Sequence, residues 1–511
     1  MEIAKCIILI IISIISILFY TAQDCSGDAS RNSGDIGGAY SGGVDSAIAV
    51  EPKYETIFKY YPFMKTKEFW SRFDRLTQDR DLPPFMNYDD IDDEIPYSGE
   101  RAFKMQTKIG QRKMLMCEMD FMNFVNEDRE IGQRYGIDIP CVIIYAGSSP
   151  GMHLGMLLYE YPKMHVIAID PAEMHIYIPV VEMNRRITHY SLPQYALYFS
   201  MTDFGTYKLE PDDVSNKNVD IYSAGRIHRD AKIADHLQAL RENRERITQS
   251  ADAILDEINK LDYRVYYFGQ YMNNDLADMF TRVNHPLFFW SDIRSRSEDF
   301  EGGHFDPKWD AIILENFAMQ YEWSFRISAK KSMLKFRFPW DELTLDKVNT
   351  AAFADLRKRG IDMLSHLSEV KYTVPRGHLR LQTRYGYIST EMRLIYDDPA
   401  KTELFDCRKM ENRLYYFNQI ARNIRHCKNP YANRILRLCN CNDCAFEVAI
   451  LEKHKKIMLN TFDIPTFLFQ CEYVFKRMLA KDAHAYLYEP LTRSKYLQII
   501  HESFLKDKRR S

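Results

Sequence analysis

Four charged residues lie within or at the ends of apolar segments that are typical of buried strands or helices. Lys113 lies in a helix-like run, Asp292 follows PLFFWS, Lys335 lies within LKFRFPW, and Glu391 begins EMRLIY. Any one of them could be an ordinary edge or snorkelling residue. Together, however, they would converge if their segments meet at one edge of an α/β sheet. A lysine with a lowered pKa can orient a hydroxyl group and take its proton, while carboxylates fix the geometry.

The segment CVIIYAGSSPGMH, residues 141–153, predicts where a cofactor could bind. An apolar run, a turn of small residues and then a helix are typical of the nucleotide-binding corner of an α/β sheet. Gly147 and Gly151 lack a Cβ, so the backbone can bend sharply and a ligand can approach closely. The following run HVIAID ends at Asp170, whose carboxylate could accept hydrogen bonds from both hydroxyls of a ribose. The pattern fits dinucleotide enzymes, S-adenosylmethionine (SAM) enzymes and a βα turn that binds nothing.

A Lys–Asp–Lys–Glu set suits methyl transfer from SAM to a sugar hydroxyl. Its sulfonium makes the methyl group electrophilic, and a sugar hydroxyl becomes an effective nucleophile once its proton has left. Carboxylates alone would raise the pKa of a neighbouring lysine, whereas a second lysine and the sulfonium would lower it. These residues therefore favour methyl transfer to a sugar hydroxyl.

Length and composition indicate a globular protein. The 511 residues are enough for two or three domains, or for one elaborated domain with extensions. With 46% hydrophobic and 27% charged residues and a net charge of −3, the chain can bind a polyanion only through a local basic surface. The 10 cysteines are mostly scattered and indicate reduced thiols.

One group of cysteines has a spacing that metal sites use. Cys439, Cys441 and Cys444, with His426 and Cys427 upstream, could ligate zinc. No second pair follows at zinc-finger spacing, so the sequence favours thiols without a metal.

The first 23 residues contain an almost unbroken apolar run, residues 7–20, preceded by Lys5. The run is short for a bilayer span, which needs about 20 residues, and has the length of a signal-peptide core. Lys5 favours a lumenal orientation of the rest of the chain. The lack of any Asn-X-Ser/Thr acceptor disfavours that location. A signal anchor, a cleaved signal and an incidental start all remain open.

The remaining segments predict one large domain with additions. Residues 24–50 are rich in Gly and Ser and are typical of a flexible linker. Residues 51–480 predict a Rossmann-like α/β domain with a central mixed sheet flanked by helices. The βα rhythm stops at about residues 191–261, where a charged helix over residues 229–247 indicates a helical insertion. Residues 481–511 predict an extension that ends in a frayed basic tail.

Several stretches, in the same order along the chain, resemble the poxvirus cap-specific mRNA (nucleoside-2′-O-)-methyltransferases. Members of this family are also the small, stimulatory subunit of the viral poly(A) polymerase. The stretches are FMNYDDIDDEIPY, IGQRKMLMCEMDF, IIYAGSSPGMH, the strand end AID, SDIRS, LKFRFPW, STEMRL, ENRLYYFNQIARN and FDIPT. They cover residues 85–466 apart from the insertion, and trypanosomatid cap methyltransferases share the tetrad more distantly. The resemblance implies a SAM-dependent methyltransferase fold and methylation of the 2′-hydroxyl of the first transcribed nucleotide of m7G-capped mRNA.

The resemblance also implies a role for individual residues. The catalytic tetrad would be Lys113, Asp292, Lys335 and Glu391, with Lys335 as the base. SAM would bind at Gln111, Tyr145, Gly147, Gly151 and Asp170. The family has an arginine two residues after that aspartate, where this chain has Ala172, so this contact with the carboxylate end of the cofactor is in doubt.

Cap recognition in this family implies that methylguanine stacks between two aromatic rings, here Tyr97 and Trp340. Glu411 would bind the base edge as one acid. The second acid is Glu342 by direct count, with Asp341, which stands where the family has proline, as the alternative. N7-methylation makes guanine cationic, so a ring sandwich with carboxylates would select it over the unmethylated base.

The partners follow from the same resemblance. Arg294 and Arg296 could hold RNA phosphates or be ordinary surface arginines. Alternatives to an active viral enzyme are a non-catalytic cap-binding or processivity subunit of a viral poly(A) polymerase, and a membrane-tethered cap binder without catalysis. The complete tetrad favours the enzyme, because a scaffold has no physical use for these four charges. We expect capped mRNA and a poly(A) polymerase catalytic subunit as partners. We also expect a cytoplasmic catalytic domain, at a viral factory or in virions, with a possible membrane tether through residues 7–20.

Overall fold

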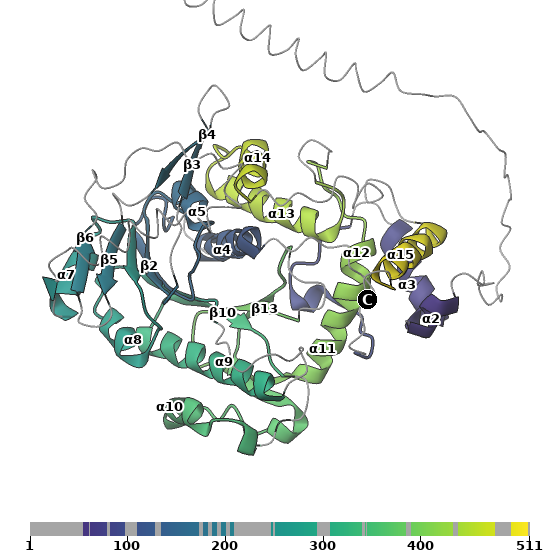
Figure 1. Ribbon diagram of the computed structural model, residues 1–511, viewed down its shortest axis with the longest axis horizontal. Helices are drawn as coiled ribbons and strands as arrows, with labels where there is room; N and C mark the ends of the chain where they lie inside the picture. The colour runs from purple at the N-terminus through teal and green to yellow at the C-terminus, as the bar shows by residue number, and fades with distance from the viewer. Residues whose placement is uncertain are drawn as a thin grey trace, which may run out of the picture. The chain divides into compact units, whose positions relative to one another are not determined.

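A ten-stranded mixed sheet lies between layers of helices in the computed structural model of the protein (Figure 1). The structure describes residues 55–60, 62–78, 82–97, 110–127, 134–172, 177–181, 187–191, 196–200, 205–208, 247–248, 251–293, 307–339, 343, 345–384, 390–432, 438–475 and 492–508. All of them belong to one compact unit, Lys53–Ser511.

The strand order of the large sheet is β12-β13-β10-β9-β1-β2-β8-β5-β6-β7. The bounds are β1 Cys141–Ala146, β2 Met164–Ile169, β5 Ala196–Ser200, β6 Gly205–Lys208, β7 Ile247–Thr248, β8 Val265–Phe268, β9 Leu287–Ser291, β10 Lys331–Phe336, β12 His378–Arg380 and β13 Met392–Tyr396. Neighbours from β10 through β5 are parallel, whereas the pairs at the two ends of the sheet are antiparallel. From β1 the chain builds outward through β2 and β8, and then crosses over to β9 and β10. The order therefore reverses between β1 and β9, and such switch points bind ligands at the carboxyl ends of the strands.

Two small antiparallel sheets accompany the large one. The first pairs β3 Tyr177–Val181 with β4 Ile187–Ser191, and the second pairs β11 Lys371–Pro375 with β14 Thr402–Asp406.

Helices cover both faces of the large sheet, with α4, α5, α13 and α14 on one side and α8 and α9 on the other (Figure 1). The bounds are α2 Glu55–Tyr60, α3 Lys67–Gln78, α4 Gly110–Glu127, α5 Leu154–Glu160, α7 Ala251–Lys260, α8 Asn274–Phe280, α9 Pro307–Ile327, α10 Ala354–Lys358, α11 Cys407–Tyr416, α12 Arg422–Ile424, α13 Asn442–Ile457, α14 Ile464–Phe475 and α15 Arg493–Lys508. A π-helical turn, Phe417–Ala421, joins α11 to α12. Short 3-10 turns are Pro62–Lys65, Tyr88–Asp90, Leu345–Lys347, Thr350–Phe353 and Leu367–Glu369.

Continuous apolar runs explain the central strands. Every residue of β1, β2, β8, β9 and β13 is buried, as expected for strands that are covered on both faces. The predicted α/β fold with a mixed sheet flanked by helices is therefore confirmed. The helix-like run predicted around Lys113 is also present, as α4.

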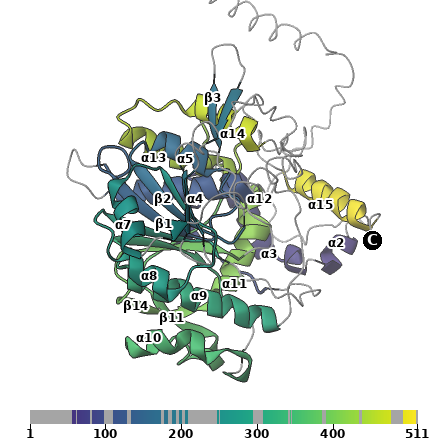
Figure 2. The ribbon, with the colours of Figure 1, turned by 60° about the vertical axis from the view of Figure 1, so that its left-hand side comes forward.

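The predicted C-terminal extension contains a helix that reaches into the predicted basic tail. Residues 493–508 form α15, which packs beside α2 and α3 (Figure 2). The ring of Tyr496 is fully buried and lies 4.9 Å from that of Phe73, while Arg493 Nε donates to Asp74 Oδ1 at 2.9 Å. The packing of Tyr496 on Phe73 therefore holds α15 against α3. The helix includes Lys506 and Lys508 of the predicted tail.

The insertion at 191–261 is only partly helical, contrary to its prediction. Its described residues include α7 but also strands β5, β6 and β7, and β5 extends the large sheet by pairing in parallel with β8. The sequence of β5, ALYFS, contains Tyr and Phe, residue types that are enriched in strands. The charged helix predicted over residues 229–247 lies outside the described residues, apart from Ile247 in β7.

The predicted membrane tether, residues 7–20, lies outside the described residues, as does the predicted linker at 24–50. Among the helices that the structure describes, none is long and apolar enough to cross a bilayer.

Candidate active site

The four predicted catalytic side chains come together at the carboxyl edge of the sheet. Lys113 lies in the first turn of α4, Asp292 follows β9, Lys335 lies on β10 and Glu391 precedes β13. Lys113 Nζ lies 3.0 Å from Glu391 Oε1, and Lys335 Nζ lies 2.9 Å from Asp292 Oδ1 and 3.6 Å from Glu391 Oε2. The side chains are 9–21% exposed, so a ligand can reach them although most of their surface is buried. Segments as far apart as residues 113 and 391 therefore form one cluster.

Arg393 is a fifth charged member that the sequence analysis missed. Its guanidinium is buried, and Nη2 lies 2.7 Å from Asp292 Oδ1 and 3.9 Å from Glu391 Oε1. Nη1 donates to the Ser291 carbonyl oxygen at 3.3 Å. Arg393 pairs directly with Lys335 across β10 and β13. Its position two residues after Glu391, on the same strand face, is the sequence signal that could have revealed it.

The charges of the cluster fix the ionisation of Asp292. Burial alone would raise the pKa of this carboxyl, but the positive charges of Arg393, Lys335 and Lys113 outweigh burial and hold the pKa well below its usual range. A depressed pKa in the folded state means that the stabilisation by Asp292 is complete above the ordinary carboxyl pKa of about 3.9. It is lost only as the pH falls through the lower folded value. Asp292 is therefore an ionised anchor at neutral pH and not a proton donor.

Gln382 holds the remaining carboxylate. Its Nε2 donates to the Glu391 carbonyl oxygen at 2.7 Å and to Glu391 Oε1 at 3.2 Å. Glu391 thus accepts hydrogen bonds from Lys113 and Gln382 and forms an ion pair with Lys335, and these contacts fix its orientation between the two lysines.

The glycine turn after β1 packs directly against this cluster. Gly147 has φ +77°, and its N–H donates to the Ile169 carbonyl oxygen at 2.9 Å. The Asp292 N–H donates to the Ala146 carbonyl oxygen at 2.9 Å. A Cβ on Gly147 would lie 2.8 Å from Ile293 N and 2.9 Å from Asp292 C. Gly147 therefore allows the glycine turn and the backbone of Asp292 and Ile293 to touch directly.

Gly147→Ala is expected to destabilise the protein and to displace Asp292. Gly360→Ala is the matched control, because Gly360 has a similar φ of +82° but a Cβ added there would have no atom within 4 Å. We expect a loss in the free energy of unfolding of about 1 kcal/mol for the control. The Gly147 variant should lose about 1–3 kcal/mol more, from forced overpacking. Urea unfolding of both variants measures the difference, and equal losses would contradict the close approach.

Gln111 and Tyr145 lie beside the same turn but differ in exposure. Gln111 Oε1 is 2.9 Å from His153 Nδ1, and His153 Nε2 is 2.8 Å from Glu118 Oε1, so α4 is bound to the end of the turn. Tyr145 is buried, with its ring 5.6 Å from that of Trp290. Burial, together with the charges of Glu118 and Asp292, raises the pKa of the Tyr145 phenol well above its usual value. The Tyr145 side chain is therefore a neutral support beneath the turn.

Asp170 closes the turn from the other side. Its Oδ2 accepts from the Ser149 N–H at 3.0 Å and its Oδ1 from the Ala172 N–H at 2.8 Å. Each carboxylate oxygen keeps a second lone pair for a ligand. Ala172 stands at the position of the arginine expected from the resemblance. Its carbonyl oxygen accepts a hydrogen bond from the Tyr267 hydroxyl at 2.7 Å.

Two of the predicted cap-binding residues are described: Glu411 lies on α11, and Tyr97 packs against this helix. The Tyr97 N–H donates to Asn412 Oδ1 at 3.1 Å, and the Tyr97 ring lies 5.1 Å from that of Tyr415. Glu411 precedes Asn412 and is buried. An open cleft of about 670 Å³ adjoins this region, with Glu94 and Asn412 in its lining. The other predicted residues, Trp340, Glu342, the alternative Asp341, and Arg294 with Arg296, lie outside the described residues.

The fold and the site define an α/β protein with a nucleotide-type turn beside a cluster of two lysines, an arginine and two carboxylates. Comparison with known proteins agrees with this class. A profile of the family described as "Poly A polymerase regulatory subunit" matches residues 80–180, which include Gln111, Lys113, the glycine turn and Asp170. The chain is 34% identical over 87 residues to the cap-specific mRNA (nucleoside-2′-O-)-methyltransferases of Myxoma virus strains Lausanne and Uriarra.

The match is partial. The similarity to the Myxoma virus proteins covers 16% of this chain, and the chain spans only 24% of the length of these curated relatives. The resemblance seen in the motifs is confirmed at this level. The chain is a distant, partial match to the family of poxvirus-type poly(A) polymerase regulatory subunits and cap-specific mRNA 2′-O-methyltransferases.

Proposed function

We propose that the protein is a SAM-dependent methyltransferase of Rossmann-like fold that methylates the 2′-hydroxyl of the first transcribed nucleotide of m7G-capped mRNA. The observation that carries the proposal is the convergence of Lys113, Asp292, Lys335 and Glu391 beside the turn at Gly147. The partial relationship to cap-specific methyltransferases supports the same reaction.

The turn would bind the nucleoside part of SAM. Gly147 and Gly151 both have positive φ, +77° and +65°, and they bend the chain at the point where the strand order reverses. Asp170 would accept hydrogen bonds from the ribose hydroxyls, and Gln111 would contact the ligand from α4. Tyr145 would support the turn from below. Bound SAM would supply an electrophilic methyl group.

Lys335 is the residue that would take the proton of the 2′-hydroxyl. Three cationic side chains, Lys113, Lys335 and Arg393, face two carboxylates, Asp292 and Glu391. An arginine does not give up its proton in a protein, so one lysine can be neutral and leave a cluster without net charge. Lys335 Nζ touches both carboxylates, which fix its direction and stabilise the ammonium that forms as the hydroxyl loses its proton. Lys113, on the far side of Glu391, would hold that carboxylate in place.

Recognition of the cap would use the aromatic and acidic residues assigned by resemblance. Tyr97 and Trp340 would stack on the methylated guanine, and Glu411 and Glu342 would bind its edge. Arg294 and Arg296, which closely follow Asp292, would bind RNA phosphates next to the reacting ribose.

A second function is a processivity subunit of a poly(A) polymerase. The description of the matching family profile favours it, and it is compatible with an active methyltransferase. A catalytic polymerase subunit would then be a partner in addition to capped mRNA, in the cytoplasm where both RNA and SAM are present.

Methyl transfer from labelled SAM tests the proposal. Three RNAs of one sequence are compared: m7G-capped, uncapped, and capped with a 2′-O-methyl group already present on the first nucleotide. We expect label only in the first RNA, because only it combines the cationic base with a free acceptor hydroxyl. Equal labelling of capped and uncapped RNA, or no labelling at all, would contradict the proposed function.

A further inference from the structure

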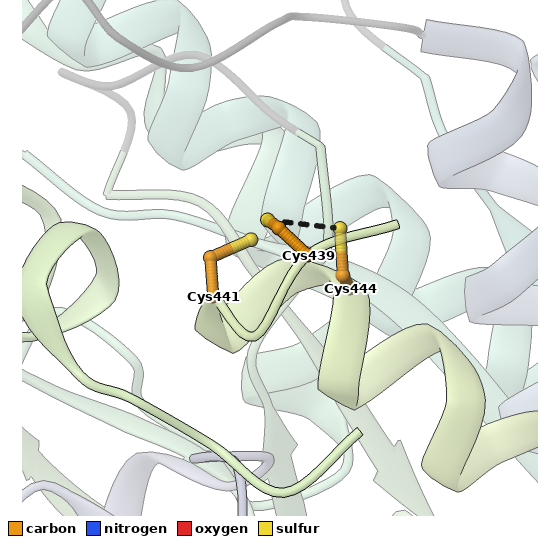
Figure 3. A group of neighbouring side chains, drawn as sticks. All are labelled: Cys439, Cys441 and Cys444. Atoms are coloured by element: carbon orange, nitrogen blue, oxygen red, sulfur yellow. Dashed lines mark hydrogen bonds between the residues drawn. The ribbon is translucent and has the colours of Figure 1, made fainter. Parts of the chain in front are cut away.

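Three cysteines meet away from the proposed active site, where the chain enters α13. Cys439, Cys441 and Cys444 are buried, and their sulfur atoms all lie within 4.8 Å of one another. Figure 3 shows the three sulfur atoms turned toward one another. Cys439 Sγ and Cys444 Sγ are 3.7 Å apart, which is far longer than the bond of about 2.05 Å in a disulfide.

The distance between the sulfur atoms of Cys439 and Cys444 matches the one that a tetrahedral zinc ion requires. Thiolates bind zinc at about 2.3 Å, so two sulfurs at corners of a tetrahedron are about 3.8 Å apart. We propose that Cys439, Cys441 and Cys444 bind a structural zinc ion, with Cys427 as the fourth ligand. Zinc is preferred over magnesium or calcium because thiolates are soft ligands. Binding displaces the thiol protons to solvent and changes no oxidation state.

Cys427 is the further cysteine that the fold brings to this turn. Its side chain is fully buried, and its N–H donates to the carbonyl oxygen of Asn440, between Cys439 and Cys441, at 2.7 Å. A set of four thiolates around a divalent ion has a net negative charge. Arg384 Nη2 lies 3.5 Å from Cys444 Sγ and would offset part of that charge. The sequence alone favoured thiols without a metal, because no second cysteine pair follows at zinc-finger spacing.

The ion would fasten α13 to the helix that carries Lys113. Cys444 and Glu447 are one turn apart on α13. Glu447 accepts from Arg112 Nε at 3.0 Å and Nη2 at 2.8 Å, and also from Arg384. Arg112 lies between Gln111 and Lys113 on α4. A zinc ion at the start of α13 would therefore stabilise the helix pair that positions these two residues.

Metal analysis of the full chain tests this proposal. We expect one zinc per chain by mass spectrometry in protein purified without chelator. We also expect thiolate-to-cobalt charge-transfer bands and intense tetrahedral d–d bands after replacement by Co²⁺. Cys444→Ser and Cys427→Ser should each lower the zinc content at least several-fold, whereas Cys471→Ser, a buried cysteine on α14, should retain one zinc.

Three results would overturn the proposal. The first is that reduced wild-type protein contains no zinc and shows no cobalt bands. The second is that freshly isolated protein contains a disulfide between Cys439 and Cys444. The third is that Cys444→Ser keeps its full zinc content. Full zinc content in Cys427→Ser would overturn the assignment of the fourth ligand. The wild-type measurements decide the question even if a variant fails to fold.

Discussion

Replacement of Lys335 by alanine is expected to reduce methyl transfer to capped RNA by about 10²–10⁴-fold. Lys335 Nζ is the only lysine nitrogen among the described residues with ion-pair contacts to both Asp292 and Glu391. Its loss removes the group that would orient the hydroxyl and take its proton. SAM binding should change little, because the glycine turn and Asp170 do not depend on the lysine. Single-turnover rates with labelled SAM, together with equilibrium binding of SAM, measure the two effects separately.

Lys331→Ala is the matched control on the same strand. Lys331 Nζ pairs with the exposed Asp397 at 3.0 Å and lies four residues before Lys335, away from the tetrad. This variant should keep methyl transfer within a few-fold of the wild type. Comparable rates for Lys335→Ala and the wild type would remove Lys335 from the catalytic machinery.

Glu447→Gln is expected to lower the free energy of unfolding by about 3–5 kcal/mol. The carboxylate is fully buried and is the shared partner of Arg112 and Arg384, at 2.8–3.0 Å. Removing its charge leaves two buried guanidinium groups without an anion between them, and burial of an uncompensated charge is costly. The helix pair α4–α13 should loosen first, because Glu447 joins it.

Glu452→Gln on the same helix is the control for this change. Its carboxylate is partly exposed and accepts from the Tyr431 hydroxyl at 3.0 Å, a bond that glutamine can also accept. We expect a change within about 1 kcal/mol for this variant. Urea unfolding of the two variants gives the comparison, and an equally small loss for Glu447→Gln would show that the buried network is not stabilising.

The tetrad was predictable because each of its members interrupts or ends an apolar segment. Asp292 follows the parallel strand β9, whereas Glu391 precedes β13, which runs antiparallel to β10, so both residues lie at the same edge of the sheet. Arg393 was not predicted, because its role depends on the antiparallel register that places it opposite Lys335. No local pattern sets that register, since β10 and β13 are separated by β11 and β12 in the chain.

Long-range packing accounts for the other differences. Only residues 506–508 of α15 belong to the predicted basic tail, and the helix packs through Tyr496 on Phe73, more than 400 residues earlier in the chain. In α4, Arg112 and Asp120 are buried and paired with the distant residues Glu447 and Arg380. Such pairs join distant segments, so only the three-dimensional structure can reveal them.

The position of the transferred methyl group tests the central claim most directly. RNA labelled by the enzyme is digested with a nuclease that leaves the cap joined to the first nucleotide, and the methylated nucleoside is identified. Our account predicts that the label is on the 2′-oxygen of the first nucleotide, at the site where Lys335 would remove the proton. Label on a base, on cap N7 or on internal riboses would contradict it.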